Sequence, residues 1–215
     1  MENYKPYVIL NAAMSLDGKI ATKTYDSKLS SEKDLTRVHY LRSKVDAIMV
    51  GINTVIRDNP LLTVRYGYNG KPIRIVIDSN ARIDINSKIM RDNDVKNIVV
   101  ISEKGKDRIK ELKSYADVII SGRDRVDLKN LMHILYARGI RKVLLEGGGE
   151  LNWSMFANRL IDEVIVTIEP VIVGGRDAIT LVEGEGFEKI EEGIKLSLKS
   201  IDKIDDEVIL RYQVL

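Results

Sequence analysis

The sequence predicts an α/β fold built around a mainly parallel sheet, and three observations support this. Apolar segments of strand length alternate along the chain with amphipathic segments of helical spacing, which is the pattern of successive βαβ units. Most of the apolar segments are nearly free of polar residues, as in strands that are covered on both faces. The C-terminal tail instead alternates apolar and polar residues, which predicts an antiparallel pair at one edge.

The expected strands are short runs rich in Val, Ile and Leu, several of which end in glycine or small polar residues. The strands expected in the main sheet cover residues 7–14, 46–51, 73–77, 97–101, 117–120, 142–145, 163–168 and 171–176. The antiparallel pair is expected over residues 194–201 and 207–214.

Helix boundaries are indicated by capping residues, glycine and proline. Ser31 and Asp34 form a start that resembles a capping box, and Asp127 caps a helix that Gly139 closes. Pro60 ends a short helix that follows Gly51, the glycine at the end of the strand expected over 46–51. Further helical segments are expected around residues 107–113 and directly after residues 147–149.

Composition limits the classes of function. A length of 215 residues suits a single domain over 1–215 with a substantial core. The 34 basic and 32 acidic residues give a formal net charge of +2, so we expect no nucleic-acid partner. With no cysteine and only His39 and His133, the chain lacks thiolate ligands and has too few histidines for a histidine-based zinc site. We therefore expect no metal.

Targeting signals are missing from the sequence. The N-terminus, MENYKPYVILN, does not pair a basic region with a long apolar one, and no apolar run reaches the length of a membrane span. We expect a cytoplasmic protein with no membrane partner.

The most informative stretch is residues 142–157, where an apolar run ends in Glu146, breaks on Gly147, Gly148 and Gly149, and restarts with helical spacing. Glycines let the backbone approach an anion, and the amides at a helix N-terminus favour a phosphate. The segment matches neither G-x-G-x-x-G nor the Walker sequence. Taken alone, it favours a plain tight connection slightly over a phosphate site.

Other strand ends carry similar residues, so the weak signals reinforce one another. Glycine or small polar residues stand at 50–54, 77–82, 120–123, 145–150 and 173–176. Because the ends of parallel strands share one edge, we expect a cleft there for a long phosphate-bearing ligand such as a dinucleotide. Ser79, Asn80 and Arg82 could hold a phosphate, although a polar turn is the simpler interpretation. Lys19, after the Asp17-Gly18 turn, is on spacing alone an ordinary exposed lysine.

Three ordered motifs resemble the riboflavin-biosynthesis reductases, from about Pro6 to the C-terminus. They are MSLDGKIA at residues 14–21, Val50-Gly51 with TVIRDNPLLTVR at 54–65, and LEGGG with Leu151-Asn152 at 145–152. The resemblance implies a dihydrofolate-reductase-like fold with a mainly parallel central sheet, flanking helices and antiparallel C-terminal strands. It also implies NADPH as the cofactor, with NADH left open, and a homodimer.

The resemblance assigns cofactor-binding residues by position. They are Thr54, Asp58, Ser79, Asn80, Ala81, Arg82, Gly147, Gly148, Gly149 and Glu150. A cation and a hydroxyl in the turn at 79–82 suit the 2′-phosphate that distinguishes NADPH from NADH.

The same matching places the phosphorylated pyrimidine substrate on Asp26, Arg42, Leu62 and Arg65, with the arginines on its 5′-phosphate. Lys19 and Glu146 are the expected catalytic residues. The hypothesis is hydride transfer from nicotinamide C4 to C1′ of the ribosylamine in its ring-opened imine form, while the cofactor supplies the chemistry. Lys28 stands where many bacterial members of the family, whose reductase domain is fused to a deaminase domain, have an aromatic residue beside the nicotinamide.

Within this family, the absence of cysteine bears on which form of the pyrimidine is the substrate. A zinc deaminase domain needs a P-C-x-x-C element, and the chain has no cysteine. It therefore resembles the stand-alone enzymes, whose substrate is 2,5-diamino-6-ribosylamino-4(3H)-pyrimidinone 5′-phosphate. The alternatives are a reductase for the deaminated analogue, a dihydrofolate reductase, and a non-catalytic nucleotide-binding module.

Overall fold

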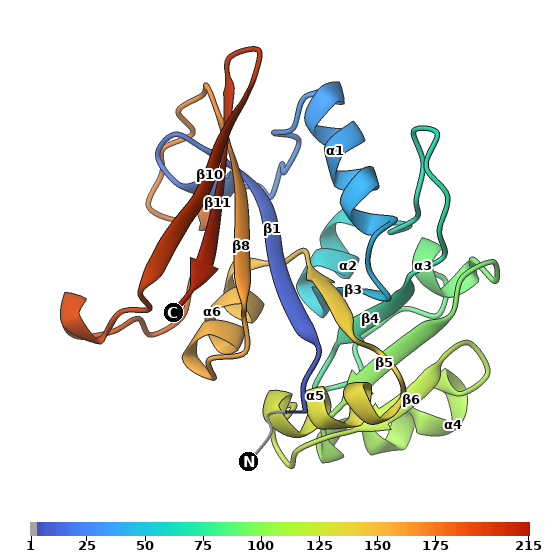
Figure 1. Ribbon diagram of the computed structural model, residues 1–215. Helices are drawn as coiled ribbons and strands as arrows, with labels where there is room; N and C mark the ends of the chain where they lie inside the picture. Colours follow the sequence, from blue (N-terminus) through green and yellow to red (C-terminus); the bar gives the residue numbers. More distant parts are fainter. Residues whose placement is uncertain (1–3) are drawn as a thin grey trace. The chain divides into compact units, whose positions relative to one another are not determined.

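The computed structural model describes residues 4–215 (Figure 1). Contacts along the chain divide it into two compact units. The first unit comprises the described residues 4–7 together with 39–144, and the second comprises 8–38 and 145–215. Each unit is described by itself below.

The first unit is built on a sheet with the strand order β7-β3-β4-β5-β6. Strands β3 to β6 are parallel, with Met49 opposite Ile75, and Val99 opposite both Val76 and Val118. The strand bounds are β3 Ala47–Gly51, β4 Ile73–Ile77, β5 Asn97–Ile101, β6 Asp117–Ile120 and β7 Lys142–Leu145. The helical bounds are α2 Ile52–Asp58, α3 Lys88–Arg91, η1 Glu103–Arg108, α4 Ile109–Leu112 and α5 Leu128–Ala137.

Alternate strand residues form the core of this unit. Because side chains of a strand alternate between faces, Ile48 and Val50 of β3 lie on one face, as do Val99 and Ile101 of β5. The same buried cluster takes apolar residues from three helices, which are Ile52 and Val55 of α2, Ile89 and Met90 of α3, and Leu112 of α4. Burial of these side chains therefore fixes the three helices on that face of the sheet.

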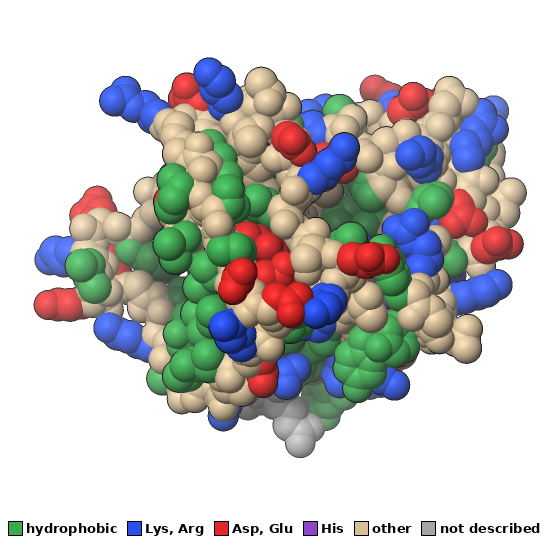
Figure 2. All heavy atoms as spheres, turned by 90° about the horizontal axis from the view of Figure 1, so that it is seen from above, with side chains coloured by type: hydrophobic (Ala, Val, Ile, Leu, Met, Phe, Trp, Pro, Cys, Tyr) green, Lys and Arg blue, Asp and Glu red, His purple; other side chains and the backbone are tan. Residues whose placement is uncertain are grey.

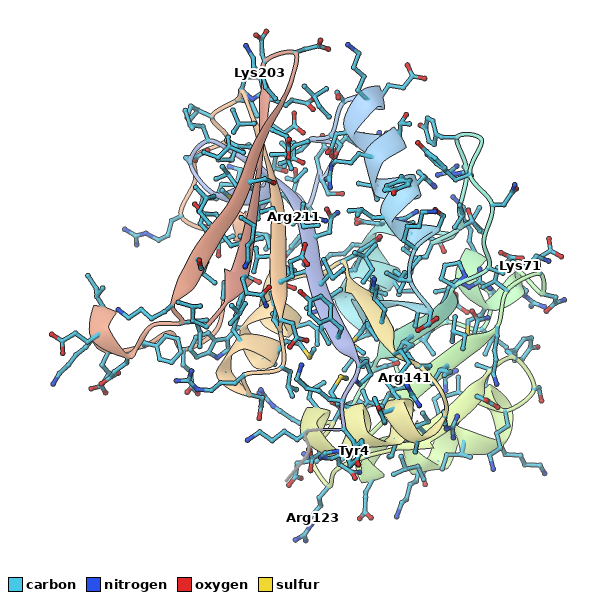
Figure 3. All side chains as sticks on the ribbon, viewed as in Figure 1. Tyr4, Lys71, Arg123, Arg141, Lys203 and Arg211 are labelled. Atoms are coloured by element: carbon cyan, nitrogen blue, oxygen red, sulfur yellow. The ribbon has the colours of Figure 1, made fainter. Side chains whose placement is uncertain are left out.

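The N-terminal residues of the described chain pack on α5. The Tyr4 ring lies 5.5 Å from that of Tyr136, and the guanidinium carbon of Arg141 lies 3.7 Å from the Tyr136 ring centroid (Figure 3). The Tyr136 ring thus contacts both a second aromatic ring and a cation, and the ring contact anchors the segment before β1.

The second unit contains a sheet with the order β10-β11-β8-β1. β1 and β8 are parallel, with Ser15 opposite Glu169, whereas β11 is antiparallel to both β8 and β10. Arg211 of β11 also forms an ion pair with Glu163 of β8, at 2.6 Å between Nε and Oε1 (Figure 3). The bounds are β1 Tyr7–Ser15, α6 Gly149–Ala157, β8 Glu163–Glu169, η2 Ile190–Glu192, β10 Leu196–Ile204 and β11 Glu207–Val214.

Two smaller features complete the chain. A two-stranded sheet pairs β2 with β9, and helix α1 starts after Ser31, whose Oγ accepts the Asp34 N–H at 3.1 Å. The bounds are β2 Lys19–Ala21, β9 Ile179–Thr180 and α1 Glu32–Arg42. Of α1, the residues up to Val38 belong to the second unit and those from His39 onward to the first. The capping signal at Ser31 is thereby confirmed.

The predicted strand at residues 171–176 is wrong. Its backbone groups bond elsewhere, since the Val171 carbonyl accepts the Leu16 N–H and the amides of Val173 and Gly174 donate to Asp17. Gly174 also has a φ of 66°, which no regular strand adopts. Sequence periodicity could not detect these competing partners.

The remaining fold predictions agree with the structure apart from boundaries. The strands at 73–77, 97–101, 117–120 and 142–145 have the predicted limits. The helical segment around 107–113 begins earlier, as a 3₁₀ helix that continues into α4, and β10 runs to Ile204. Within residues 4–215, no helix is both long and apolar enough to cross a membrane. The single domain over 1–215 stays a prediction.

Candidate functional site

The turn after β4 in the first unit is held by hydrogen bonds within itself and to the segments that follow β5 and β6. Asp78 is buried, and its Oδ2 accepts the Ile83 N–H at 2.8 Å. Burial raises the pKa of Asp78, while the hydrogen bonds to its carboxylate oppose that shift. Ser79 accepts the Val126 N–H on its Oγ and the Ser102 hydroxyl on its carbonyl. The turn is therefore a fixed platform.

Within this turn the predicted cofactor residues differ in exposure. Asn80 and Arg82 are exposed, whereas the Ala81 side chain is buried and its backbone has a positive φ of 53°. An Arg82 amino group, Nη2, donates to Asn53 Oδ1 at 2.7 Å. Arg82 is thus held beside the start of α2, with a cation presented to solvent.

Helix α2 carries two further predicted cofactor residues. Thr54 is half-buried and Asp58 is exposed, and their spacing of four places them on one face of the helix. Because Arg82 bonds to Asn53 at the start of this helix, the structure brings the turn at 79–82 and α2 together.

The segment between α2 and β4 carries the predicted substrate residues Leu62 and Arg65. The Leu62 side chain is buried at 5% exposure, so it packs in the core of the unit, while the Arg65 side chain is exposed. Arg42, at the end of α1, donates from Nη1 to the Thr63 carbonyl at 3.1 Å. The structure therefore places Arg42 against the same segment that carries Arg65.

In the second unit, Gly147 and Gly149 follow β7, and each position favours glycine for a different structural reason. Gly147 has a positive φ of 85°. Gly149 is crowded, because a Cβ there would lie 2.6 Å from both the Thr180 carbonyl oxygen and Cγ of Glu183. Gly149 also opens α6, next to the exposed Glu150.

The predicted catalytic residues lie around that turn and around β2. Glu146 is half-buried and directly follows β7. Lys19 is half-buried at the start of β2, and its Nζ donates to the Ala178 carbonyl at 3.3 Å. Since the chain from Ala178 continues to Thr180 and Glu183, one segment contacts both Lys19 and Gly149.

Asp17 organises the loop before Lys19, and sequence reasoning treated it only as a turn residue. Its carboxylate accepts the Ser15 hydroxyl at 2.6 Å, the Val173 N–H at 3.0 Å and the Gly174 N–H at 2.7 Å. The Ser15 hydrogen bond is the largest cause that lowers the pKa of Asp17 to about 2. The only hint in the sequence is an acid directly before a glycine.

Asp26, the remaining predicted substrate residue, is exposed in the loop between β2 and α1. Its Oδ1 accepts the Lys28 N–H at 3.2 Å, and its own N–H donates to the Thr22 hydroxyl at 3.1 Å. The loop thus has local hydrogen bonds of its own, and Lys28 is exposed.

Charge is mixed on the surface that Figure 2 presents, where basic and acidic side chains are interspersed. In residues 4–215, no group of three or more histidine or acidic side chains is arranged to hold a metal ion.

The fold and these motifs were compared with known proteins. A family model described as the RibD C-terminal domain matches residues 6–210. The chain belongs to this family. It is 47% identical to the Methanothermobacter thermautotrophicus protein named 2,5-diamino-6-ribosylamino-4(3H)-pyrimidinone 5′-phosphate reductase, over 98% of this chain and 99% of that protein. An Aquifex aeolicus protein of the same name is 36% identical over 98% and 97%.

Among solved structures, a similar one is a Thermotoga maritima deaminase/5-amino-6-(5-phosphoribosylamino)uracil reductase. It superposes with a TM-score of 0.84 and 25% identity, over 98% of this chain and 57% of that chain. The resemblance to the riboflavin-biosynthesis reductases is thereby confirmed, as is the reductase-domain fold of a mainly parallel sheet with antiparallel C-terminal strands.

Proposed function

We propose that the chain is an NADPH-dependent oxidoreductase of riboflavin biosynthesis. It reduces 2,5-diamino-6-ribosylamino-4(3H)-pyrimidinone 5′-phosphate to the ribitylamino product. The observation that carries this proposal is the end-to-end match, at 47% identity, to a protein with that reductase name. The match spans both chains almost completely.

In the first unit, the turn at 79–82 and α2 are the proposed NADPH-binding elements. Arg82 is exposed and oriented by Asn53, so its guanidinium suits the 2′-phosphate of NADPH. Thr54 and Asp58 on α2 supply a hydroxyl and a carboxylate for the ribose and amide groups. NADH lacks the 2′-phosphate, and it is therefore the weaker cofactor in this proposal.

In the second unit, the glycine turn and α6 are the proposed site of a cofactor phosphate. The nine-residue α6 starts at Gly149, so its first amides and its dipole favour a negative charge next to Gly147 and Gly148. These glycines carry no Cβ that would hold the phosphate away. Glu150 is assigned to the cofactor by its place in the motif.

The reaction proposed is hydride transfer to C1′ of the ring-opened imine of the substrate, with NADPH supplying the hydride. Lys19 donates one N–H to Ala178, so its remaining N–H groups are free to serve a ligand and to favour protonation as the sugar ring opens. Glu146 would bind the N–H edge of the pyrimidine or the sugar hydroxyls. Asp26, Arg42, Leu62 and Arg65 complete the proposed substrate set, and Leu62 would contribute its backbone because its side chain is buried.

The deaminated analogue is the second candidate substrate. The Thermotoga maritima structure is named for a uracil reductase, and its fold matches this chain over 98% of its length. The two substrates differ at one ring position, where an amino group replaces a carbonyl oxygen.

We also propose a cytoplasmic homodimer. Strand β10 is the edge of its sheet and exposes Leu196, Leu198 and Ile201, at 41%, 49% and 63%. An exposed apolar edge strand favours pairing with a second copy. Light scattering should give a dimer for the native protein and a monomer for Ile201→Asp, with Lys203→Asp on the same strand as the control. A native monomer would rule out the dimer.

The first experiment measures loss of NADPH absorbance with the diamino substrate and with its deaminated analogue, using NADH as the cofactor control. Oxidation with the diamino compound alone establishes the proposed reaction. Preference for the analogue reverses the order of reduction and deamination. Binding of NADPH with no oxidation of it by either compound would contradict the proposal and favour a non-catalytic binding module.

A further inference from the structure

The segment that carries Arg65 is tied to the first unit at three points. Nη1 of the buried Arg74 donates to the Leu61 carbonyl at 3.1 Å, and Nη1 of Arg42 donates to the Thr63 carbonyl, also at 3.1 Å. The third tie runs the other way, since Nδ1 of His39 accepts the backbone N–H of Arg65 at 2.9 Å. In Figure 1 this segment is the loop between α2 and β4, beside the last turn of α1, and Lys71 near its end is labelled in Figure 3.

His39 is a buried residue with its own packing contacts, unlike the Arg65 side chain in the segment that it holds. Its side chain is only 2% exposed, and its ring lies 4.9 Å from the ring of Tyr66 at an angle of 43°. It sits on α1, one turn before Arg42, so both residues extend from the same face of a regular helix. Arg65, by contrast, is exposed.

The backbone around Arg65 needs such support. Leu62 and Tyr66 both have positive φ, at 50° and 58°, a region that costs side-chain-bearing residues roughly 1 kcal/mol or more. Conformations of this kind persist where surrounding contacts over-determine them. The bond from the Arg65 N–H to His39 lies between the two strained positions and next to Tyr66.

We propose that His39 is a positioning residue that fixes the backbone of Arg65 and thereby sets the affinity for the substrate phosphate. This inference rests on the proposed function, which assigns Arg65 to that phosphate. His39 does not touch the substrate in this scheme. It acts because a guanidinium binds a phosphate best when two of its N–H groups reach the phosphate oxygens in a fixed, bidentate geometry.

The proposed role of His39 depends on one atom, the acceptor Nδ1, so substitutions that keep or remove an acceptor can test it. Asparagine places an acceptor oxygen near the position of Nδ1, whereas phenylalanine keeps the ring that contacts Tyr66 and loses the acceptor. His39→Asn should therefore preserve the function and His39→Phe should lose it. His133→Phe, at the exposed histidine of α5, controls for loss of a histidine elsewhere.

Two measurements test the proposal. Amide hydrogen exchange at Arg65 should be at least about tenfold faster in His39→Phe than in the native protein, and near native in His39→Asn and His133→Phe. Losing one hydrogen bond worth about 1 kcal/mol predicts a roughly fivefold higher KM for the pyrimidine substrate in His39→Phe. Its kcat and its KM for NADPH should stay within about twofold of native.

The outcomes separate this inference from the proposed function. Native exchange at Arg65 in His39→Phe would overturn the inference, and so would faster exchange with an unchanged substrate KM. If the native protein reduces neither pyrimidine, ribose 5-phosphate serves as the probe in a calorimetric titration. A weaker affinity in His39→Phe with recovery in His39→Asn then supports His39, although the proposed reaction has failed. Equal affinities in all variants would refute it.

Discussion

The two units hold their candidate residues in different ways. In the first unit, the turn at 79–82 is fixed by backbone bonds between neighbouring strand ends, as where the Ser79 carbonyl accepts the Ser102 N–H at 3.0 Å. In the second unit, the glycine turn and Lys19 depend on irregular segments, through close packing at Gly149 and a carbonyl at Ala178. The first arrangement lies where a parallel sheet brings its strand ends to one edge, whereas the second depends on contacts between irregular segments.

The largest effect is expected at Lys19 and Glu146 of the second unit. Replacing either with alanine should lower kcat by about a hundredfold or more, because proton-transfer and electrostatic groups contribute on that scale. NADPH affinity should change much less. Steady-state kinetics with a fluorescence titration of NADPH give both quantities, and unchanged turnover in both variants would remove these residues from the reaction.

The next effect tests close packing in the second unit. Gly149→Ala places a methyl group 2.6 Å from the Thr180 carbonyl oxygen, so the backbone must move. Overpacking of this kind should lower the free energy of unfolding by about 1–3 kcal/mol, measured by urea denaturation. Glu150→Ala, at the next and exposed position of α6, is the control and should differ little from native. Equal stability of the two variants would show that the turn tolerates a side chain.

The same contrast explains what the sequence could predict. Strands β4, β5 and β6 were predictable to the residue because each is a short, mainly apolar run that a polar residue follows directly. Asp17 was read as a turn residue, since its partners Val173 and Gly174 are more than 150 positions away in the chain. The wrong strand at 171–176 has the same cause, because long-range acceptors took its amides.

For the candidate residues, too, local motifs were readable from the sequence and long-range contacts were not. Local motifs predicted which residues to consider, but not that the Leu62 side chain is buried or that Arg42 bonds to the Thr63 carbonyl. His39 was noted only as one of two histidines. Its role follows from a contact between α1 and a loop 26 positions later, which periodicity does not encode.

A smaller effect is expected in the first unit. Arg82→Ala should reduce the preference for NADPH over NADH by about tenfold or more, because a hydrogen bond to a charged group contributes about 1.5–3 kcal/mol. Arg82→Lys keeps the charge and should lose less. Asn53→Ala removes only the partner of the guanidinium, so its loss measures how much orientation contributes. An unchanged ratio of kcat/KM for the two cofactors in Arg82→Ala would place the 2′-phosphate elsewhere.

The last prediction concerns a buried acidic cluster in the second unit, formed by Asp34, Glu169 and Glu207, with Arg37 beside Asp34 at 2.8 Å. Burial is the first cause that raises the pKa of Glu169 to about 7, followed by the charge and hydrogen bond of Glu207. Because the folded state binds this proton more tightly, the stabilisation is complete below the ordinary value of 4.5 and is lost as the pH rises through about 7.

Glu169→Gln removes this dependence, since a glutamine can donate to Glu207 without a titrating proton. The variant should therefore gain stability relative to the native protein as the pH rises from about 4.5 to about 7, and the difference should be constant at higher pH. Urea unfolding across that range measures it, with Glu192→Gln on the exposed η2 as the control. A difference independent of pH would mean that Glu169 is ionised throughout. The carboxyl group of Glu169, at the end of β8, would then be charged and not neutral where the irregular segment from Pro170 begins.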